Sequence, residues 1–296
     1  MKERKNIEIL SSFWIKVIAA ISMTLDHLGI FLNFYGVITT DSILFFALRI
    51  LGRLALPLFI FLLVEGINHS KNLWRYILRL SIGLVLVLVP TLILNRYYSL
   101  HTENPFVDLV IIALFLTLIR QKDWKKFLAI LPLGYAILSS VIYIYSFKTG
   151  AEVHWLPDSL RCAYGIYALA LALGFELAIK IANKNMKPFE KQYEASLNDL
   201  QQTSYYIFLK KGLCSCSIVV VNVLFWVLFA FIFKECDYLN ISIQTYSIFA
   251  FVPLIFYNGK LGYNKPWFKY GMYLYFDLHI LILYIILQLS CVGTLF

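Results

Sequence analysis

Ionisable side chains occur inside stretches of this chain that are apolar enough to cross a membrane. The segment RILGRLALPLFIFLLVEGINH carries Arg49 and Arg53 in its first half, and Glu65 and His69 at its far end. If residues 44–67 form one helix, Arg53 lies near the bilayer midplane, because about 20 apolar residues at ~1.5 Å each cross the hydrocarbon core. An arginine at that depth costs roughly 2.5 to 3.5 kcal/mol, so we expect it to face the protein interior and meet a partner.

Two other apolar segments supply candidate partners for Arg53. Asp26 and His27 lie about two-thirds of the way along residues 14–34, and His279 lies in the middle third of residues 271–292. Three costly polar groups at one depth predict a shared site, where a buried arginine would keep a nearby imidazole neutral, the state that a general base requires. Either His27 or His279 fits the role of base. Asp26 would orient His27 or pair with Arg53.

A second group of polar residues lies towards the basic ends of the same segments. Lys16 shares a helical face with Met23 and His27, since intervals of seven and four residues place side chains in line. Asn258-Gly259 is a turn signal, and turn amides together with lysines favour anions. We therefore expect a phosphate-bearing donor to be bound by Lys16, Glu65, His69, Asn258 and Lys260. The plainer interpretation is a lysine at lipid headgroups, a packed histidine and an ordinary basic loop.

The elements that must position these residues are membrane helices. Of the 296 residues, 60% are hydrophobic and 17% aromatic, which is typical of a polytopic membrane protein. The net charge of +9 fits the lysine and arginine excess of cytoplasmic loops better than nucleic-acid binding. We expect an all-α bundle with a cytoplasmic N-terminus and about nine spans, at residues 14–34, 44–67, 73–94, 106–119, 127–147, 160–181, 212–233, 243–258 and 271–292.

The chain is expected to form a single domain over residues 1–296. Its sizeable polar insertion is the stretch 183–211, where Pro188 is predicted to open an amphipathic helix lying on the cytoplasmic membrane surface. The cysteines show no paired metal-binding spacing, so no metal is expected.

Several motifs resemble those of the TraX family, typified by the membrane protein that acetylates the N-terminus of conjugative pilin. They are IKVIAAISMTLDH at 15–27, LRILGRLALPLFIFLLVEGINHS at 48–70, IFYNGKLGY at 255–263 and YLYFDLHILILY at 273–284. The resemblance implies a multi-pass protein of the bacterial cytoplasmic (inner) membrane, related to acyltransferases that take acetyl groups from cytosolic acetyl-CoA. The acceptor would be a pilin-like peptide, a glycan or a small molecule, reached from the membrane lipid.

Together these observations predict an acetyl-CoA-dependent integral-membrane acyltransferase with His27, Asp26, Arg53 and His279 as its catalytic residues. A proton-coupled transporter or lipid flippase is the alternative from another class, because charged residues inside membranes also mark proton and substrate paths. No repeated half with paired broken helices is visible, which many secondary transporters have. A catalytically inert assembly or immunity partner is the third interpretation.

Overall fold

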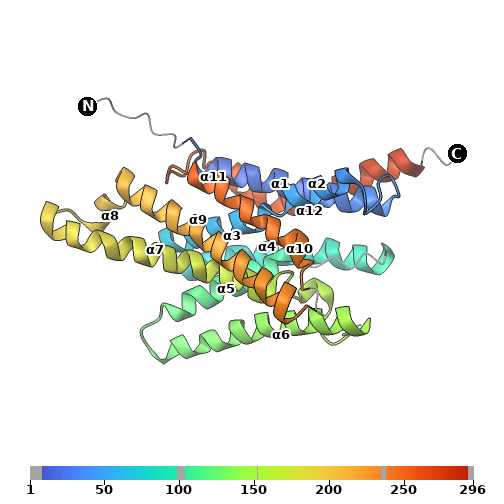
Figure 1. The fold of residues 1–296 in the computed structure, drawn as a ribbon, viewed down its shortest axis with the longest axis horizontal. Helices are drawn as coiled ribbons and strands as arrows, with labels where there is room; N and C mark the ends of the chain where they lie inside the picture. The colour runs from blue at the N-terminus through green and yellow to red at the C-terminus, as the bar shows by residue number, and fades with distance from the viewer. Residues whose placement is uncertain (1–8, 99–103, 152, 235–237, 293–296) are drawn as a thin grey trace.

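The computed structural model describes residues 9–98, 104–151, 153–234 and 238–292, and its named elements are all helices (Figure 1). The all-α class is therefore confirmed. The α-helices are α1 Ser12–Phe34, α2 Ile43–Gly52, α3 Ala55–His69, α4 Leu73–Tyr98, α5 Pro105–Ile119, α6 Ile130–Thr149, α7 Gly165–Tyr193, α8 Leu197–Leu200, α9 Ser204–Val227, α10 Ile241–Gln244, α11 Phe251–Ile255 and α12 Pro266–Val292. Short segments of tighter or wider helix are η1 Trp124–Ala129, η2 Asp158–Leu160, η3 Leu228–Ile232 and η4 Thr245–Ala250.

The expected count of about nine spans is not confirmed. Within the described ranges, five helical segments are long and apolar enough to cross a membrane: Ser12–Phe34, Ile43–His69, Trp124–Thr149, Asp158–Tyr193 and Ser204–Ile232. A sixth would be α12, taken as a bent pair, whereas α5 and Ile241–Ile255 are shorter apolar segments. The 15 residues of α5 reach about 22 Å, less than the ~30 Å of a hydrocarbon core.

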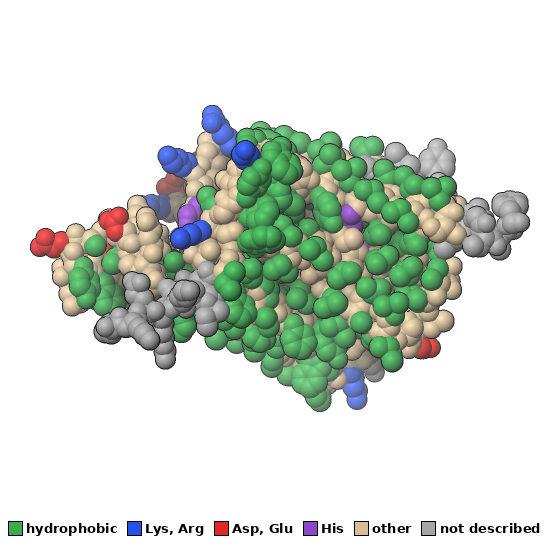
Figure 2. Space-filling model, turned by 90° about the horizontal axis from the view of Figure 1, so that it is seen from above, with side chains coloured by type: hydrophobic (Ala, Val, Ile, Leu, Met, Phe, Trp, Pro, Cys, Tyr) green, Lys and Arg blue, Asp and Glu red, His purple; other side chains and the backbone are tan. Residues whose placement is uncertain are grey.

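The surface agrees with a membrane protein. Figure 2 shows hydrophobic side chains over the broad middle of one face, with most of the charged side chains gathered at its left-hand end. A contiguous apolar surface of this extent is rare on a soluble monomer. The long apolar helices and this apolar surface (Figure 2) together indicate a membrane protein.

The centre of the bundle is formed by α3 and α7. About three-fifths of the most apolar window of each of these two spans, 61%, is buried inside the molecule. Small residues along α7 let neighbouring helices approach closely, as at Gly174, where an added Cβ would lie 3.1 Å from the Cβ of Ser217 on α9. Phe61 of α3 and Phe175 of α7 meet edge to face, with ring centroids 5.7 Å apart. This packing fixes α3, the helix that carries much of the site.

The apolar segment 44–67 forms one candidate span with a short interruption, because α2 ends at Gly52 and α3 begins at Ala55. Pro57 has no N–H, so the carbonyl of Arg53 loses its helical partner at the break. Arg53 and Leu54 keep right-handed helical dihedral angles at this interruption. The break therefore places Arg53 at the joint of two half-helices, buried in the bundle.

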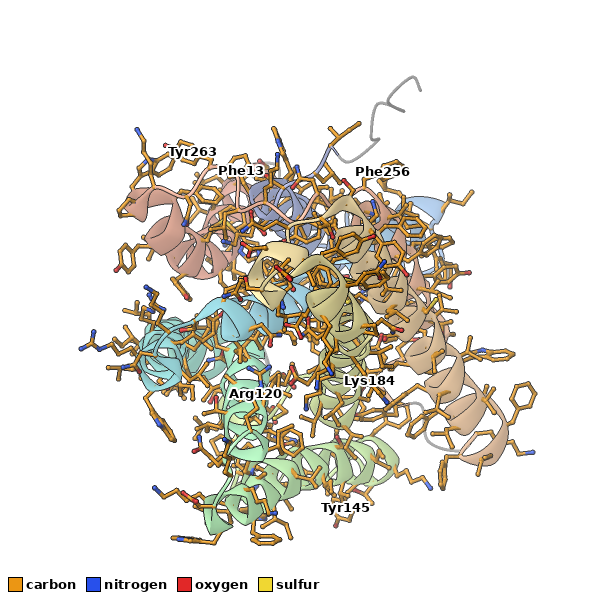
Figure 3. The ribbon with its side chains drawn as sticks, turned by 90° about the vertical axis from the view of Figure 1, so that its left-hand side faces the viewer. Phe13, Arg120, Tyr145, Lys184, Phe256 and Tyr263 are labelled. Atoms are coloured by element: carbon orange, nitrogen blue, oxygen red, sulfur yellow. The ribbon has the colours of Figure 1, made fainter. Side chains whose placement is uncertain are left out.

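The loop between α11 and α12 closes the start of α1. The carbonyls of Lys260 and Leu261 accept from the first N–H groups of the helix, those of Ser12 at 2.8 Å and Phe13 at 3.1 Å. Leu10 and Tyr257 form an isolated parallel bridge beside them. Figure 3 shows Phe13 and Tyr263 close together at this end, with ring centroids 5.6 Å apart. The loop thus satisfies backbone donors that a helix start leaves unpaired.

The prediction of a separate surface helix opening at Pro188 is wrong. Helix α7 runs without interruption to Tyr193, with Pro188 inside it. Its end packs against α8 and α9 through a small cluster of Ala182, Met186, Leu200 and Tyr206. A proline removes a single helical hydrogen bond, and here the packing of the hairpin outweighs that loss.

Candidate active site

An elongated cavity of about 1770 Å³ runs along the whole length of α1, from Ser12 to Phe34. Drug-sized ligands occupy pockets of roughly 300 to 1,000 Å³, so this space suffices for two reactants. Its walls come from α1, α2, α3, α4, the start of α5, the end of α6, the segments before α7 and α10, the α11–α12 loop and α12. The cavity is therefore built from residues distant in sequence.

One end of the cavity, here called the basic mouth, is defined by Lys16, His69, Arg79 and Lys260. Lys16 lines the same wall as Met23 and His27, as the helical spacing predicts. His69 Nδ1 lies 2.8 Å from the carbonyl oxygen of Glu65, which leaves Nε2 as the second polar atom of the ring. The other end, called the opposite mouth, is defined by Phe34, Gly150, Arg161 and Asn240.

His27 and His279 meet in the interior. Nε2 of His279 lies 2.9 Å from Nδ1 of His27, and Nδ1 of His279 lies 2.9 Å from the carbonyl oxygen of Tyr275. Since that carbonyl can only accept, a neutral His279 carries its proton on Nδ1 and accepts at Nε2. His27 then donates from Nδ1, which also lies 3.0 Å from the carbonyl oxygen of Met23.

The hydrogen-bond pattern thus assigns the tautomer of His27. With its proton on Nδ1, the lone pair of His27 is on Nε2, the atom that a general base uses. His27 lines the cavity, whereas His279 is 3% exposed and does not line it. His279 therefore holds the ring of His27 in place from behind.

Asp26 binds two arginines rather than its neighbour His27. Its carboxylate lies 2.7 Å from Nη1 of Arg49 and 2.6 Å from Nη2 of Arg53. Nη1 of Arg53 also donates to Oε1 of Gln244 at 3.1 Å. Two guanidinium charges against one carboxylate leave one positive charge in excess. We call Asp26, His27, Arg49 and Arg53 the central cluster.

Gly52 makes room for this ion pair. An added Cβ at Gly52 would lie 2.3 Å from Cβ and 2.4 Å from Oδ1 of Asp26, so the carboxylate rests directly on the backbone of α2. A glycine is thus required at this position for the close approach of Asp26.

A second buried polar network lines the cavity near the basic mouth. Nζ of Lys210 lies 3.0 Å from Oε2 of Glu65, and both side chains are buried. The Tyr257 hydroxyl donates to the same oxygen at 3.4 Å and lies 3.0 Å from Oγ of Ser12. Sequence reasoning assigned Lys210 to a basic loop and missed this contact, which joins α1, α3, α9 and the α11–α12 loop.

The TraX family model matches residues 11–189, which is more than half of the chain. This chain belongs to the TraX family. The match includes the Asp-His pair and the segment from Arg49 to His69, but not the part of the chain that holds His279.

A curated relative of this TraX-family chain is the "Probable fimbrial assembly protein FimC, serogroup H1" of Dichelobacter nodosus. The two are 43% identical over 76 residues, which is 26% of this chain. The alignment spans 29% of that relative, so the likeness is confined to a part of each protein. No solved structure matches the chain.

Seven of the nine residues predicted for the site of this TraX-family chain line one cavity: Lys16, Asp26, His27, Arg53, Glu65, His69 and Lys260. His279 contacts the cavity wall through His27. Asn258 does not line it; its Oδ1 instead accepts from the N–H of Lys260 at 2.9 Å and shapes the turn.

Two residues of the central region were left out of the predicted site. Arg49 could have been found, since it lies one helical turn from Arg53 and a buried carboxylate accepts from both. Gln244 is a lone carboxamide in an apolar segment and is fully buried beside Arg53. A polar residue inside such a segment is itself a signal.

Proposed function

We propose that this protein is an integral-membrane acetyltransferase that moves an acetyl group from acetyl-CoA to an amine or hydroxyl acceptor. The observation that carries the proposal is the His27–His279 pair, which leaves the lone pair of His27 on Nε2, in a ring that lines the same cavity as Arg49 and Arg53. Membership of the TraX family supports the same reaction class.

The donor would enter at the basic mouth. Lys16, Arg79 and Lys260 offer positive charge to the phosphates of coenzyme A, and the pantetheine arm would extend along α1 towards His27. The distance suits an extended arm, because Lys16 and His27 are separated by 11 residues, about 16 Å of helix. Glu65 is neutralised by Lys210, so its carboxylate does not repel this anion.

In the proposed reaction, Nε2 of His27 takes the proton from the acceptor as its nitrogen or oxygen attacks the thioester carbonyl. The oxyanion that forms is stabilised by the excess positive charge of Arg49 and Arg53. Collapse of the intermediate breaks the carbon–sulfur bond, and the departing thiolate takes the proton back from His27. The products are the acetylated acceptor and free coenzyme A, with no net proton left on the enzyme.

Arg49 is the better placed of the two arginines to donate to the oxyanion. Both terminal nitrogens of Arg53 already donate, to Asp26 and to Gln244, whereas Arg49 makes one bond to Asp26. Asp26 would hold the two guanidinium groups in register, and the acceptor would arrive from the opposite mouth.

The acceptor is proposed by class. The name of the Dichelobacter nodosus relative refers to fimbrial assembly, which makes a pilus or fimbrial subunit one candidate. A glycan or a small molecule fits the same chemistry, because each presents an amine or a hydroxyl. A position in the bacterial cytoplasmic membrane, with the basic mouth towards the cytosol, would give acetyl-CoA direct access.

The proposal is tested with labelled acetyl-CoA and membranes containing the protein. The wild type is expected to release coenzyme A and to transfer label. His27→Ala should lose at least ~100-fold of this activity, the usual contribution of a general base. His279→Ala should lose less, and His279→Gln, which retains an acceptor, should recover part of the loss.

The matched control is His154→Ala, which alters an exposed histidine outside the cavity. It should retain wild-type transfer. Wild-type membranes that neither transfer nor hydrolyse acetyl-CoA would overturn the acetyltransferase proposal, and full activity in His27→Ala would overturn the assignment of the base.

A transporter is the second candidate, because the cavity reaches both ends of α1. Ionisable residues inside a membrane, such as the central histidine pair, also mark proton and substrate paths in transporters. Proton-driven uptake of solute into sealed vesicles without any acyl donor would favour it. Acetyl transfer that ceases in His27→Ala would favour the enzyme instead.

A further inference from the structure

Tyr164 lines the cavity from the segment that precedes α7, and its backbone is held on both sides. Its N–H donates to both oxygens of the Asp108 carboxylate, at 3.3 Å each. Its carbonyl accepts from the hydroxyl of Tyr238 at 2.8 Å. Two buried side chains from different parts of the chain therefore fix the position of this one residue.

Holding the backbone of Tyr164 in place requires a buried carboxylate and a left-handed backbone conformation next to it. Asp108 of α5 is 2% exposed, and it also accepts from the N–H groups of Ala163 at 2.7 Å and Gly165 at 2.8 Å. Gly165 has a φ of 47°, and an added Cβ would lie 2.2 Å from Oγ of Ser140. Left-handed backbone and a buried carboxylate are features that concentrate where a side chain must be presented in one orientation.

The hydroxyl of Tyr164 differs from those of its neighbours. The hydroxyls of Tyr135, Tyr167 and Tyr238 each have a hydrogen-bond partner. Among the residues that the structure describes, the Tyr164 hydroxyl has none, and Tyr164 lines the same cavity as Arg49 and Arg53. A tyrosine with a fixed backbone and an unused hydroxyl beside the central cluster is suited to bind a reactant.

The position of Tyr164 indicates which reactant. Its segment lines the half of the cavity away from the basic mouth, together with Arg161 and Ala163. Apolar side chains make up much of this half: Ile30, Phe34, Phe147, Leu239 and Leu281. This half therefore favours a nucleophile carried on an apolar chain over the polyanionic donor.

We propose that the Tyr164 hydroxyl hydrogen-bonds the nucleophilic nitrogen or oxygen of the acyl acceptor and presents it to His27. The proposal rests on the acetyltransferase function proposed above. It makes Tyr164 an acceptor-binding residue, with Asp108 and Tyr238 as its positioning residues.

The test uses purified full-length protein in lipid nanodiscs, with labelled acetyl-CoA as donor and octylamine as an apolar amine acceptor. Acetyl-octylamine and hydrolysed acetate are measured separately. Tyr164→Phe should raise the KM for octylamine about fivefold, the effect of one neutral hydrogen bond, while the KM for acetyl-CoA stays at the wild-type value. Tyr145→Phe, a half-exposed tyrosine on α6 (Figure 3), is the control and should alter neither KM.

A double variant separates binding from a general loss of structure. Tyr238→Phe should raise the octylamine KM by a smaller factor, since it loosens the Tyr164 carbonyl. The variant with both substitutions should be no worse than Tyr164→Phe alone, because Tyr238 is expected to act through Tyr164. Additive losses, or a raised KM for acetyl-CoA, would overturn the proposed role.

Each of the remaining outcomes overturns one or both of the proposals. If the wild type acetylates octylamine and Tyr164→Phe has the same octylamine KM, the role of Tyr164 is overturned and the acetyltransferase function stands. If the wild type hydrolyses acetyl-CoA but does not acetylate octylamine, the apolar acceptor half is overturned. If the wild type consumes no acetyl-CoA, both proposals fall together.

Discussion

The surroundings of Asp26 constrain both its charge and the space that it occupies. It balances two guanidinium groups inside the bundle and rests on the backbone of α2 at Gly52. Removing one partner of a buried ion pair leaves an uncompensated charge, which typically costs about 3 to 5 kcal/mol. The central cluster therefore depends on the close approach that Gly52 of α2 permits, as well as on charge pairing.

A methyl group at Gly52 tests this arrangement. Gly52→Ala should displace the Asp26 carboxylate and destabilise the protein by about 1 to 3 kcal/mol, the usual cost of overpacking. Acetyl transfer should fall at least ~10-fold, because a displacement of ~1 Å at a site has effects of that order or larger. Gly134→Ala on α6, where a Cβ meets nothing within 4 Å, is the control. Wild-type transfer by Gly52→Ala would contradict the role given to Asp26.

At the scale of elements, the α11–α12 loop decides how α1 begins. Its carbonyls accept from Ser12 and Phe13, and it also provides Lys260 at the basic mouth. The motif YNGKLG was predicted to cradle phosphates, but its carbonyls face the start of α1 and its asparagine shapes a turn. The loop thus serves first to fix the helix that carries Asp26 and His27.

Gly262 is the sensitive position of this loop. It has a φ of 67°, and an added Cβ would lie 2.2 Å from Oγ of Ser11. Gly262→Ala should therefore destabilise the protein by at least ~1 kcal/mol, measured as a lower melting temperature in detergent. Gly271→Ala, in helix α12 with nothing within 4 Å of the added Cβ, should melt at or above the wild-type temperature. Equal melting of the two variants would show that the loop is not a rigid part of the fold.

At the scale of the whole molecule, the two mouths give the proposed reaction a direction. The basic mouth gathers Lys16, Arg79 and Lys260, while apolar side chains dominate the opposite half. Cytoplasmic loops are enriched in lysine and arginine, so the basic mouth should face the cytosol. The acetyl group would then be handed over inside the bundle, between a donor from one side and an acceptor from the other.

Cysteine labelling tests this orientation. In a background without the native cysteines, Lys260→Cys should react with a membrane-impermeant maleimide added from the cytoplasmic side only. Lys148→Cys, an exposed position at the end of α6 near the opposite mouth, should react from the other side only. The cysteine-free protein must retain acetyl transfer and take no label. Labelling of both positions from one side would rule out the proposed topology.

Sequence determined the helical class and identified seven of the residues that line the cavity. Lys16, Met23 and His27 face one cavity because a helix of 3.6 residues per turn brings them into line, and this is a local property. The sequence also marked His279 and Arg53, since a polar group within an apolar segment must find a partner somewhere in the fold.

What the tertiary structure alone decided is which partners these groups find. Asp26 could orient His27 or bind arginine, and the packing of α2 against α1 settled on the two arginines. His27 and His279 were equal candidates for the base, and in the structure they contact each other, with His27 but not His279 lining the cavity. The continuity of α7 through Pro188 was likewise set by neighbouring elements. Such choices depend on contacts between residues far apart in the chain, which helical periodicity and apolarity do not encode.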